Sequence, residues 1–354
     1  MSMADLFDYL VWRGDLDFSQ VKFGAVDGVI LSALTFIDFS AIGGGDDIKL
    51  ADAIKDYCID RKYDSVEFGL VVSAVKTNRL FCKTGRTKRF GGITVSDFVD
   101  YTEEEECVQF AAMTYHISDE LMVVAFRGTD DSVIGWHEDC RMAYLDEVPA
   151  QRMAVEYLEH MAEKYEGKRI YVVGHSKGGN LTLYSCLKCS EGVAKRIVKA
   201  FCYDGPGLAK EAFETERYEA MKKRIDIFLP QSATVGVMFC RGDRYTVIHS
   251  DGRGIFQHDP FTWELNGPRF KALTELSAVG KIHETRFRER MDELSAAEKR
   301  EAVETVFTSI AESGVRTLSE LRDKGLPKIM SIFKTYGAND KQKRELVKML
   351  LFNK

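Results

Sequence analysis

The sequence lacks the features that mark membrane-spanning, secreted and nucleic-acid-binding proteins. Its 354 residues contain no uncharged apolar run long enough to cross a bilayer. Residues 1–8 lack the basic stretch and the cleavage site of a secretory signal. The formal net charge is -6 with both signs interspersed, and no basic stripe of the kind a duplex binder carries is present. We therefore expect a cytoplasmic protein with no transmembrane segment and no nucleic-acid partner.

The sequence is also poor in metal-binding and disulfide patterns. Eight cysteines in a chain of this length do not make a disulfide scaffold. Cys186 and Cys189 have Cys-x-x-Cys spacing, but no second cysteine or histidine pair lies at zinc-site spacing. We therefore expect these two thiols to be reduced and buried, and we expect no metal or other cofactor.

The most informative stretch is residues 170–179, where an apolar run ends in a Gly-x-Ser-x-Gly sequence centred on Ser176. A helical pattern begins directly after it. This context is typical of a tight strand-to-helix turn that lifts the serine hydroxyl into a cleft. Side chains at Gly174 and Gly178 would collide with the neighbouring strand and helix, and the helix N-terminus favours negative charge near the serine. We therefore predict that Ser176 is the nucleophile of a serine hydrolase.

Strand and helix patterns alternate around this motif. Strands are predicted at residues 108–114, 121–126, 170–173, 198–203 and 225–229. The first two are expected to pair as a hairpin, and an amphipathic helix is predicted over residues 151–165. The alternation indicates an α/β fold with a mostly parallel central sheet flanked by helices. In such sheets ligands bind at the carboxyl ends of the strands.

The chain divides into three predicted segments. Residues 1–100 are predicted to be a mainly helical addition packed on the core, with no legible chemistry. Within them, the basic, glycine-rich residues 79–92 are predicted to be a loop. Residues 101–275 are the predicted α/β core. Residues 276–354 are a charged helical extension in which a capping-box sequence starts at Ser295.

A serine nucleophile needs a base, and in enzymes with this turn the order along the chain is serine, acid, histidine. That order excludes three earlier histidines: His116, His137 and His160. His175 belongs to the turn itself and is expected to point elsewhere. Of the later histidines, we favour His258, which lies in a turn-rich stretch after an apolar strand. His249 lies within that strand, and His283 opens the charged tail.

Two aspartates are candidates for the acid that orients the base. Asp204 directly follows a predicted strand and precedes Gly-Pro-Gly, a rigid turn that would fix its carboxylate at the sheet edge. Asp243 lies between two arginines in a loop, which is more typical of a solvated surface ion pair. We favour Asp204 as the acid, with Asp243 as the alternative. A non-catalytic role for Asp204 would be capping of the turn that follows it.

Two donors are expected to form an oxyanion hole. One is the backbone N–H of Lys177, the residue after the nucleophile. The other is Thr129, which follows a predicted strand and Gly128, and could donate both its N–H and its hydroxyl. Such donors typically contribute ~3 kcal/mol of transition-state stabilisation each.

These residues together resemble a known family. The sequence at 125–129, the downstream Trp136 and Asp139, and residues 174–180 resemble the class 3 (fungal-type) lipase branch of the α/β-hydrolases. The pattern His258-Asp-Pro-x-x-Trp resembles the catalytic-histidine region of that branch. The layout of residues 105–270 is most similar to an uncharacterised lipase-like family of intracellular bacterial proteins. The resemblance implies an α/β-hydrolase fold with helical additions at both ends.

The chain departs from that branch at one point. Class 3 lipases carry their acid after the strand that corresponds to residues 225–229, and residues 230–234 contain no carboxylate. Some other lipases place the acid one strand earlier, before proline and glycine, which is the position of Asp204. The resemblance therefore supports Asp204 without supplying it.

We accordingly expect a cofactor-independent serine hydrolase that cleaves a carboxylic ester, lipase- or esterase-like, of a small-molecule or lipid-like substrate. Its expected triad is Ser176, His258 and Asp204, acting through an acyl-enzyme intermediate. The alternatives are a non-catalytic binding or scaffold protein on a hydrolase fold, and a thioesterase or acyltransferase using the same triad. The sequence does not decide whether residues 131–145 form a lid, nor the oligomeric state.

Overall fold

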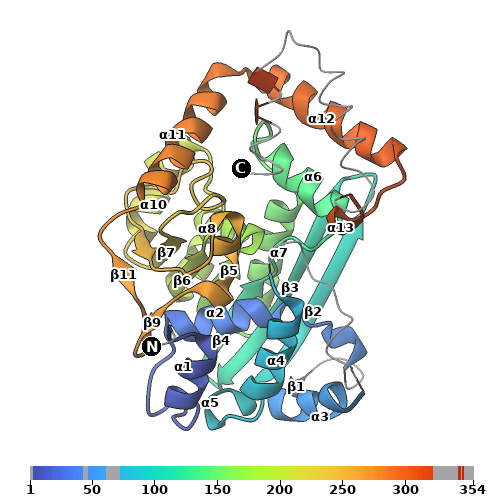
Figure 1. Cartoon of the computed structure of the whole chain (residues 1–354). Coiled ribbons are helices and arrows are strands. Elements are labelled where there is room, and N and C mark those ends of the chain that lie inside the picture. The colour runs from blue at the N-terminus through green and yellow to red at the C-terminus, as the bar shows by residue number, and fades with distance from the viewer. Residues whose placement is uncertain (1–2, 43–46, 61–71, 322–341, 344, 347–354) are drawn as a thin grey trace.

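A large sheet runs through the middle of the computed structural model (Figure 1), which describes residues 3–42, 47–60, 72–321, 342–343 and 345–346. Within these residues the sheet has nine strands in the order β1-β2-β3-β4-β5-β6-β7-β8-β11. The strands are β1 (Ile48–Lys49), β2 (Thr94–Glu103), β3 (Val108–Ser118), β4 (Leu121–Phe126), β5 (Arg169–His175), β6 (Ile197–Tyr203), β7 (Ile225–Pro230), β8 (Thr246–Ile248) and β11 (Ala272–Leu273). Two further strands, β9 (Leu265–Asn266) and β10 (Arg269–Phe270), pair with each other.

The sheet is mixed, with a parallel centre. Strands β4 to β8 run parallel to one another, whereas β1 to β4 pair antiparallel, as do β8 and β11. The predicted hairpin is confirmed, since β3 and β4 pair antiparallel next to Ser118 and Leu121. The three later predicted strands are confirmed as β5, β6 and β7. Helices lie in the crossovers from β4 to β5, β5 to β6 and β6 to β7, because a short turn can link only antiparallel strands. The described segment between β7 and β8 contains no helix.

Helices cover both faces of this sheet. One face packs against α7 (Pro149–Lys164), α8 (Lys177–Lys188), α9 (Glu191–Arg196) and α10 (Glu216–Met221). The other packs against α1 (Leu6–Arg13), α2 (Ala25–Leu34), α3 (Leu50–Asp60), α4 (Ala74–Thr84) and α5 (Lys88–Gly91). Successive strand residues alternate between the two faces, so Val172 and Val173 are both fully buried but in different clusters. Each such side chain stabilises the fold by roughly 1.5–3 kcal/mol.

The loop predicted at residues 79–92 is wrong, because this segment contains most of α4 and all of α5. Leu80 and Phe81 are fully buried and give α4 its apolar face. The basic side chain of Arg89 is also buried, and its guanidinium pairs with Asp27 at 2.6 Å. A composition rich in glycine and basic residues therefore reflects tight helix ends and one internal ion pair, rather than an exposed loop.

The expectation that Cys186 and Cys189 are reduced and buried is confirmed. Cys186 and Cys189 lie at the end of α8 as free, buried thiols. Burial raises the pKa of Cys186 well above its ordinary value, so its thiol is unreactive. Cys82 differs, because it is disulfide-bonded.

The C-terminal extension forms a third apolar cluster outside the sheet. Its helices are α11 (Ala278–Glu293), α12 (Ala296–Glu312) and α13 (Leu318–Glu320), and the predicted capping box at Ser295 starts α12. Figure 1 shows α12 lying beside α6 (Val133–Arg141), far from the N-terminal helices. Val303, Val306 and Phe307 of α12 are buried in this cluster. No helix in the described part of the chain is both long enough and apolar enough to span a membrane.

Short 3-10 turns complete the described chain: η1 (Phe39–Ala41), η2 (Lys210–Glu214), η3 (Gly254–His258) and η4 (Pro260–Thr262). η3 ends at His258, whose side chain lies against Asp204, the residue that follows β6 at its carboxyl end. That is the edge at which a ligand site is expected in such a sheet.

Candidate active site

Ser176 lies on the tight turn between β5 and α8. Its backbone has φ 60° and ψ −129°, a conformation that non-glycine residues rarely adopt. A side chain at Gly174 would collide with the carbonyl oxygen of Gly178, and one at Gly178 would collide with the carbonyl oxygen of Phe126. The two glycines therefore let β5, α8 and β4 approach closely enough to hold Ser176 in this strained turn.

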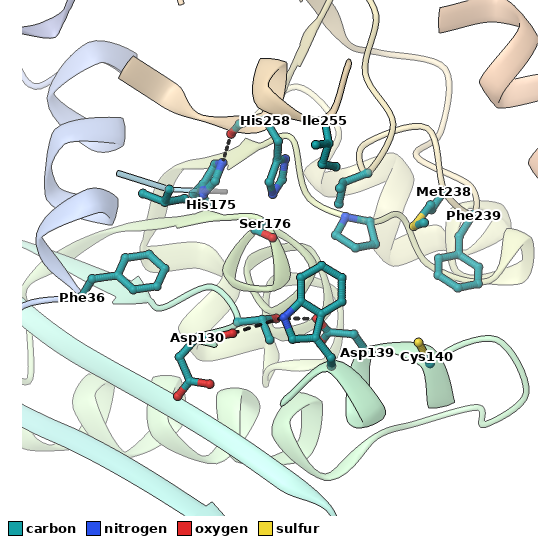
Figure 2. A pocket seen from close by; sticks show the side chains of 15 residues that line it. Phe36, Asp130, Asp139, Cys140, His175, Ser176, Met238, Phe239, Ile255 and His258 are labelled. Atoms are coloured by element: carbon teal, nitrogen blue, oxygen red, sulfur yellow. Dashed lines mark hydrogen bonds between the residues drawn. The ribbon is translucent and has the colours of Figure 1, made fainter. Parts of the chain in front are cut away.

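The hydroxyl of Ser176 faces a pocket at the carboxyl ends of the parallel strands (Figure 2). Most of the pocket wall is apolar, and its lining residues are Phe36, Val72, Thr129, Asp130, Trp136, Asp139, Cys140, His175, Ser176, Pro206, Val235, Met238, Phe239, Ile255 and His258. Phe36 and Val72 come from the N-terminal segment, in which sequence reasoning found no chemistry. No local pattern marks them, because they reach the pocket only through the packing of the N-terminal helices on the sheet.

His258, which lines this pocket, is paired with Asp204. The Nδ1 atom of His258 lies 2.6 Å from Oδ2 of Asp204, and both side chains are buried. The other carboxylate oxygen of Asp204 accepts the N–H of Gly236 at 3.0 Å. If Nδ1–H donates to the carboxylate, Nε2 of His258 carries the free lone pair and can act as a base. Figure 2 shows Ser176 and His258 lining the same pocket. No hydrogen bond joins their side chains among the described residues, a looseness common in ligand-free hydrolase sites.

The other candidate bases and the other candidate acid lie elsewhere. His249 Nδ1 is 2.7 Å from Glu264 Oε2, and His283 Nδ1 is 3.4 Å from the carbonyl oxygen of Ala233. Asp243 accepts the hydroxyl of Tyr218 at 2.8 Å, a hydrogen bond that lowers the pKa of the Asp243 carboxyl. None of these three predicted alternatives lines the pocket that contains Ser176.

The expectation that His175 points away from the site is wrong. Its side chain lines the pocket, and its ring centroid lies 4.5 Å from that of His258. Burial lowers the pKa of His175 well below its ordinary value. The imidazole is therefore neutral, and Nε2–H donates to the carbonyl oxygen of His258 at 2.8 Å. The alternation of side chains along β5 could have indicated this placement, because it puts His175 and Val173 on the same face.

Both predicted oxyanion donors lie beside the turn. The backbone N–H groups of Thr129 and Lys177 make no hydrogen bond with any described residue, so they are available to a bound oxygen. Gly128 approaches so closely that a side chain there would lie 3.2 Å from Cβ of Ser176. The hydroxyl of Thr129, in contrast, donates to the carboxylate of Asp139. The backbone N–H is therefore the group of Thr129 that can serve an oxyanion while that carboxylate is ionised.

A buried charge cluster lies beneath these donors. Nζ of Lys177 donates to the carboxylate of Glu138 and to the carbonyl oxygen of Gln109, the latter at 2.8 Å. Burial opposes the charge on Lys177, but Glu138 and Asp139 outweigh it and raise the pKa of the ammonium. Burial raises the pKa of Asp139 to about 6, against the opposing effect of Lys177. Sequence reasoning used only the N–H of Lys177 and missed this ion pair, whose partner lies 39 residues away.

In the part of the chain that the structure describes, no three histidine, cysteine, aspartate or glutamate side chains are grouped so that they could hold a metal ion.

Comparison with known proteins gives one family. Residues 84–308, well over half of the chain, match the model of the Mbeg1-like family. A solved structure titled as a crystal structure of M37 lipase is similar at 16% identity and a TM-score of 0.35. The match covers 46% of this chain and 62% of that lipase, so the chain spans about three fifths of the lipase's length. No curated protein matches the chain in sequence.

Proposed function

Because the chain belongs to the Mbeg1-like family, a lipase-like family, we propose that it is a serine hydrolase that cleaves a carboxylic ester. The proposal includes an α/β-hydrolase fold and a Ser176–His258–Asp204 triad. The observation that carries it is the buried hydrogen bond between His258 and Asp204, which lies beside a strained turn bearing Ser176. A buried histidine–carboxylate pair next to such a serine is the arrangement that acyl transfer needs.

The proposed reaction begins with attack of Ser176 Oγ on the ester carbonyl carbon. Nε2 of His258 takes the hydroxyl proton, and Asp204 stabilises the imidazolium that forms. The carbonyl oxygen becomes an oxyanion that the N–H groups of Thr129 and Lys177 stabilise. The carbon–oxygen bond to the leaving group then breaks, and His258 gives its proton to the departing alkoxide. An acyl-enzyme and an alcohol result.

Water completes the cycle. His258 removes a proton from the water molecule while its oxygen attacks the acyl carbon, and a second oxyanion occupies the same two N–H groups. The bond to Ser176 Oγ breaks, the serine recovers its proton from His258, and a carboxylic acid is released. No redox step and no added reactant other than water are needed.

The apolar pocket wall supports an ester with an apolar acyl group. Large apolar side chains line the pocket, namely Phe36, Trp136, Met238, Phe239 and Ile255. Each methylene of an acyl chain that they remove from water contributes about 0.8 kcal/mol to binding. We therefore propose a lipid-like or small apolar ester as the substrate class.

Hydrolysis of p-nitrophenyl esters by the purified protein tests this function. The wild type should release p-nitrophenol, and Ser176→Ala should remove that activity while thermal unfolding stays cooperative. Full activity in Ser176→Ala would exclude the proposed nucleophile. A folded wild type with no activity on esters of any acyl length would favour a non-catalytic binding protein.

A further inference from the structure

Helix α6 connects the C-terminal extension with the two backbone groups proposed as the oxyanion hole. Consecutive residues of α6 bind the side chains of the two residues that carry these groups: Glu138 binds that of Lys177, and Asp139 binds that of Thr129. Glu138 is fully buried and also accepts backbone N–H groups from Gln109 and Ala150, at 2.9 and 2.8 Å. A movement of α6 would therefore move both proposed donors.

A carboxylate of α12, that of Glu304, contacts α6 and the residues just after it. His137 and Arg141, one helical turn apart, approach Glu304 at 3.2 and 3.3 Å. Tyr144 donates its hydroxyl to Glu304 as well. In an α-helix Asp139 points about 200° away from both His137 and Arg141, so Glu304 and Thr129 contact α6 from different sides.

Three more contacts fix α6 and the loop before it against the extension. The ring of Phe307 stacks on that of His137 with centroids 4.3 Å apart. At the start of α6, Val133 N–H donates to the carbonyl oxygen of Arg316, and in the preceding loop the carbonyl oxygen of Asp131 accepts Leu318 N–H, each at 2.9 Å. Residues 131–141 are thus clamped by the extension, which argues against a freely opening lid at this position.

We propose that Glu304 of α12 is a positioning residue for the oxyanion hole, acting through α6. This inference rests on the proposed hydrolase function. Glu304 does not touch the pocket, but it sets the position of the helix whose Glu138 and Asp139 orient Lys177 and Thr129. The C-terminal extension, which lies beyond the strands of the sheet, is therefore part of the machinery that stabilises the transition state.

Kinetics of Glu304→Ala test the inference, with Glu312→Ala as a matched control on the same helix. Glu312 is exposed and makes no ion pair or hydrogen bond with a described residue. With p-nitrophenyl butyrate, Glu304→Ala should lower kcat roughly tenfold and change KM less than about twofold, because a displaced donor weakens transition-state binding selectively. Glu304→Gln, which keeps the hydrogen bond from Tyr144, should recover much of the loss. Glu312→Ala should match the wild type.

Hydrogen exchange supplies a readout that does not depend on activity. Amides of residues 127–141 and of Lys177 should exchange faster in Glu304→Ala than in Glu312→Ala. If Glu304→Ala does not fold, Tyr144→Phe, which deletes one donor to the same carboxylate, should show both effects in smaller form.

Unchanged kcat in an active, folded Glu304→Ala would overturn the inference, even if KM rises and kcat/KM falls by the same factor. If the wild type itself hydrolyses no ester, the proposed function fails, and the exchange data decide separately whether Glu304 positions this segment.

Discussion

Both the backbone conformation and the carboxylate contacts of Asp204 fix its position beside His258. Its φ of 46° turns the chain sharply at the end of β6, and its two carboxylate oxygens contact His258 and Gly236. The residue lies one strand before the position at which class 3 lipases carry their acid. A strand-end carboxylate can reach the same histidine from either position, because neighbouring strand ends lie only about 5 Å apart.

Asp204→Asn should lower kcat for ester hydrolysis by on the order of 10³–10⁴-fold, because the amide cannot hold the required imidazole tautomer or stabilise its cation. Asp243→Asn should stay within about twofold of the wild type, since Asp243 bonds Tyr218 outside the pocket. Steady-state kinetics on both variants provide the comparison. The reverse pattern would assign the acid to Asp243.

Asp259 gives a prediction for stability rather than for rate. Burial raises the pKa of its carboxyl from 3.8 to about 6, although the N–H of Phe261 donates to it at 3.1 Å. The folded state therefore binds this proton more tightly than the unfolded state. The resulting stabilisation is complete below pH 3.8 and is lost as the pH rises through about 6.

Asp259→Asn, which keeps the acceptor for Phe261, should remove this pH dependence. Between pH 5 and pH 8 the free energy of unfolding of the wild type should fall relative to that of the variant by on the order of 1 kcal/mol. Urea unfolding at the two pH values measures the difference. Parallel pH profiles for the two proteins would show that Asp259 does not titrate in this range.

At the scale of elements, the turn between β5 and α8 is the most strongly determined feature. Its glycines lie next to the serine in the sequence, so the Gly-x-Ser-x-Gly pattern predicted it directly, although Gly178 also packs against Phe126 of β4. The alternating strands β3 to β7 were likewise predicted from local patterns. Helices α4 and α5 were not, because their stability comes from burial of Phe81 and from the pairing of Arg89 with Asp27, 62 residues away.

Gly174→Ala should destabilise the protein by about 3 kcal/mol or more, since the added methyl group meets a backbone carbonyl that cannot move aside. Gly192→Ala is the matched substitution, in α9 with open space around the new methyl group. It should leave stability unchanged or raise it by about 0.5 kcal/mol. Thermal unfolding of both variants checks the contrast, and equal shifts would contradict the packing argument.

At the scale of the whole molecule, two parts of the chain line the pocket and a third packs behind it. Ser176, Thr129 and His258 come from the sheet and its loops, Phe36 and Val72 from the N-terminal segment, and the supports of α6 from the C-terminal extension. The sequence allowed prediction of the first group because Ser176 and Thr129 follow recognisable strands and His258 lies in a turn-rich stretch after them. It gave no indication of the others, since Phe36 near Gly128 and Glu304 near Arg141 meet only after the chain has folded.

The central claim is that Ser176 is an activated nucleophile. The most direct measurement is labelling of the purified protein with a fluorophosphonate probe, followed by mass spectrometry of the modified peptide, with Ser176→Ala and His258→Ala alongside. The account predicts one adduct, located on Ser176, that is absent from Ser176→Ala and strongly reduced in His258→Ala. Labelling of Ser176 that does not need His258, or no labelling of the folded wild type, would contradict it.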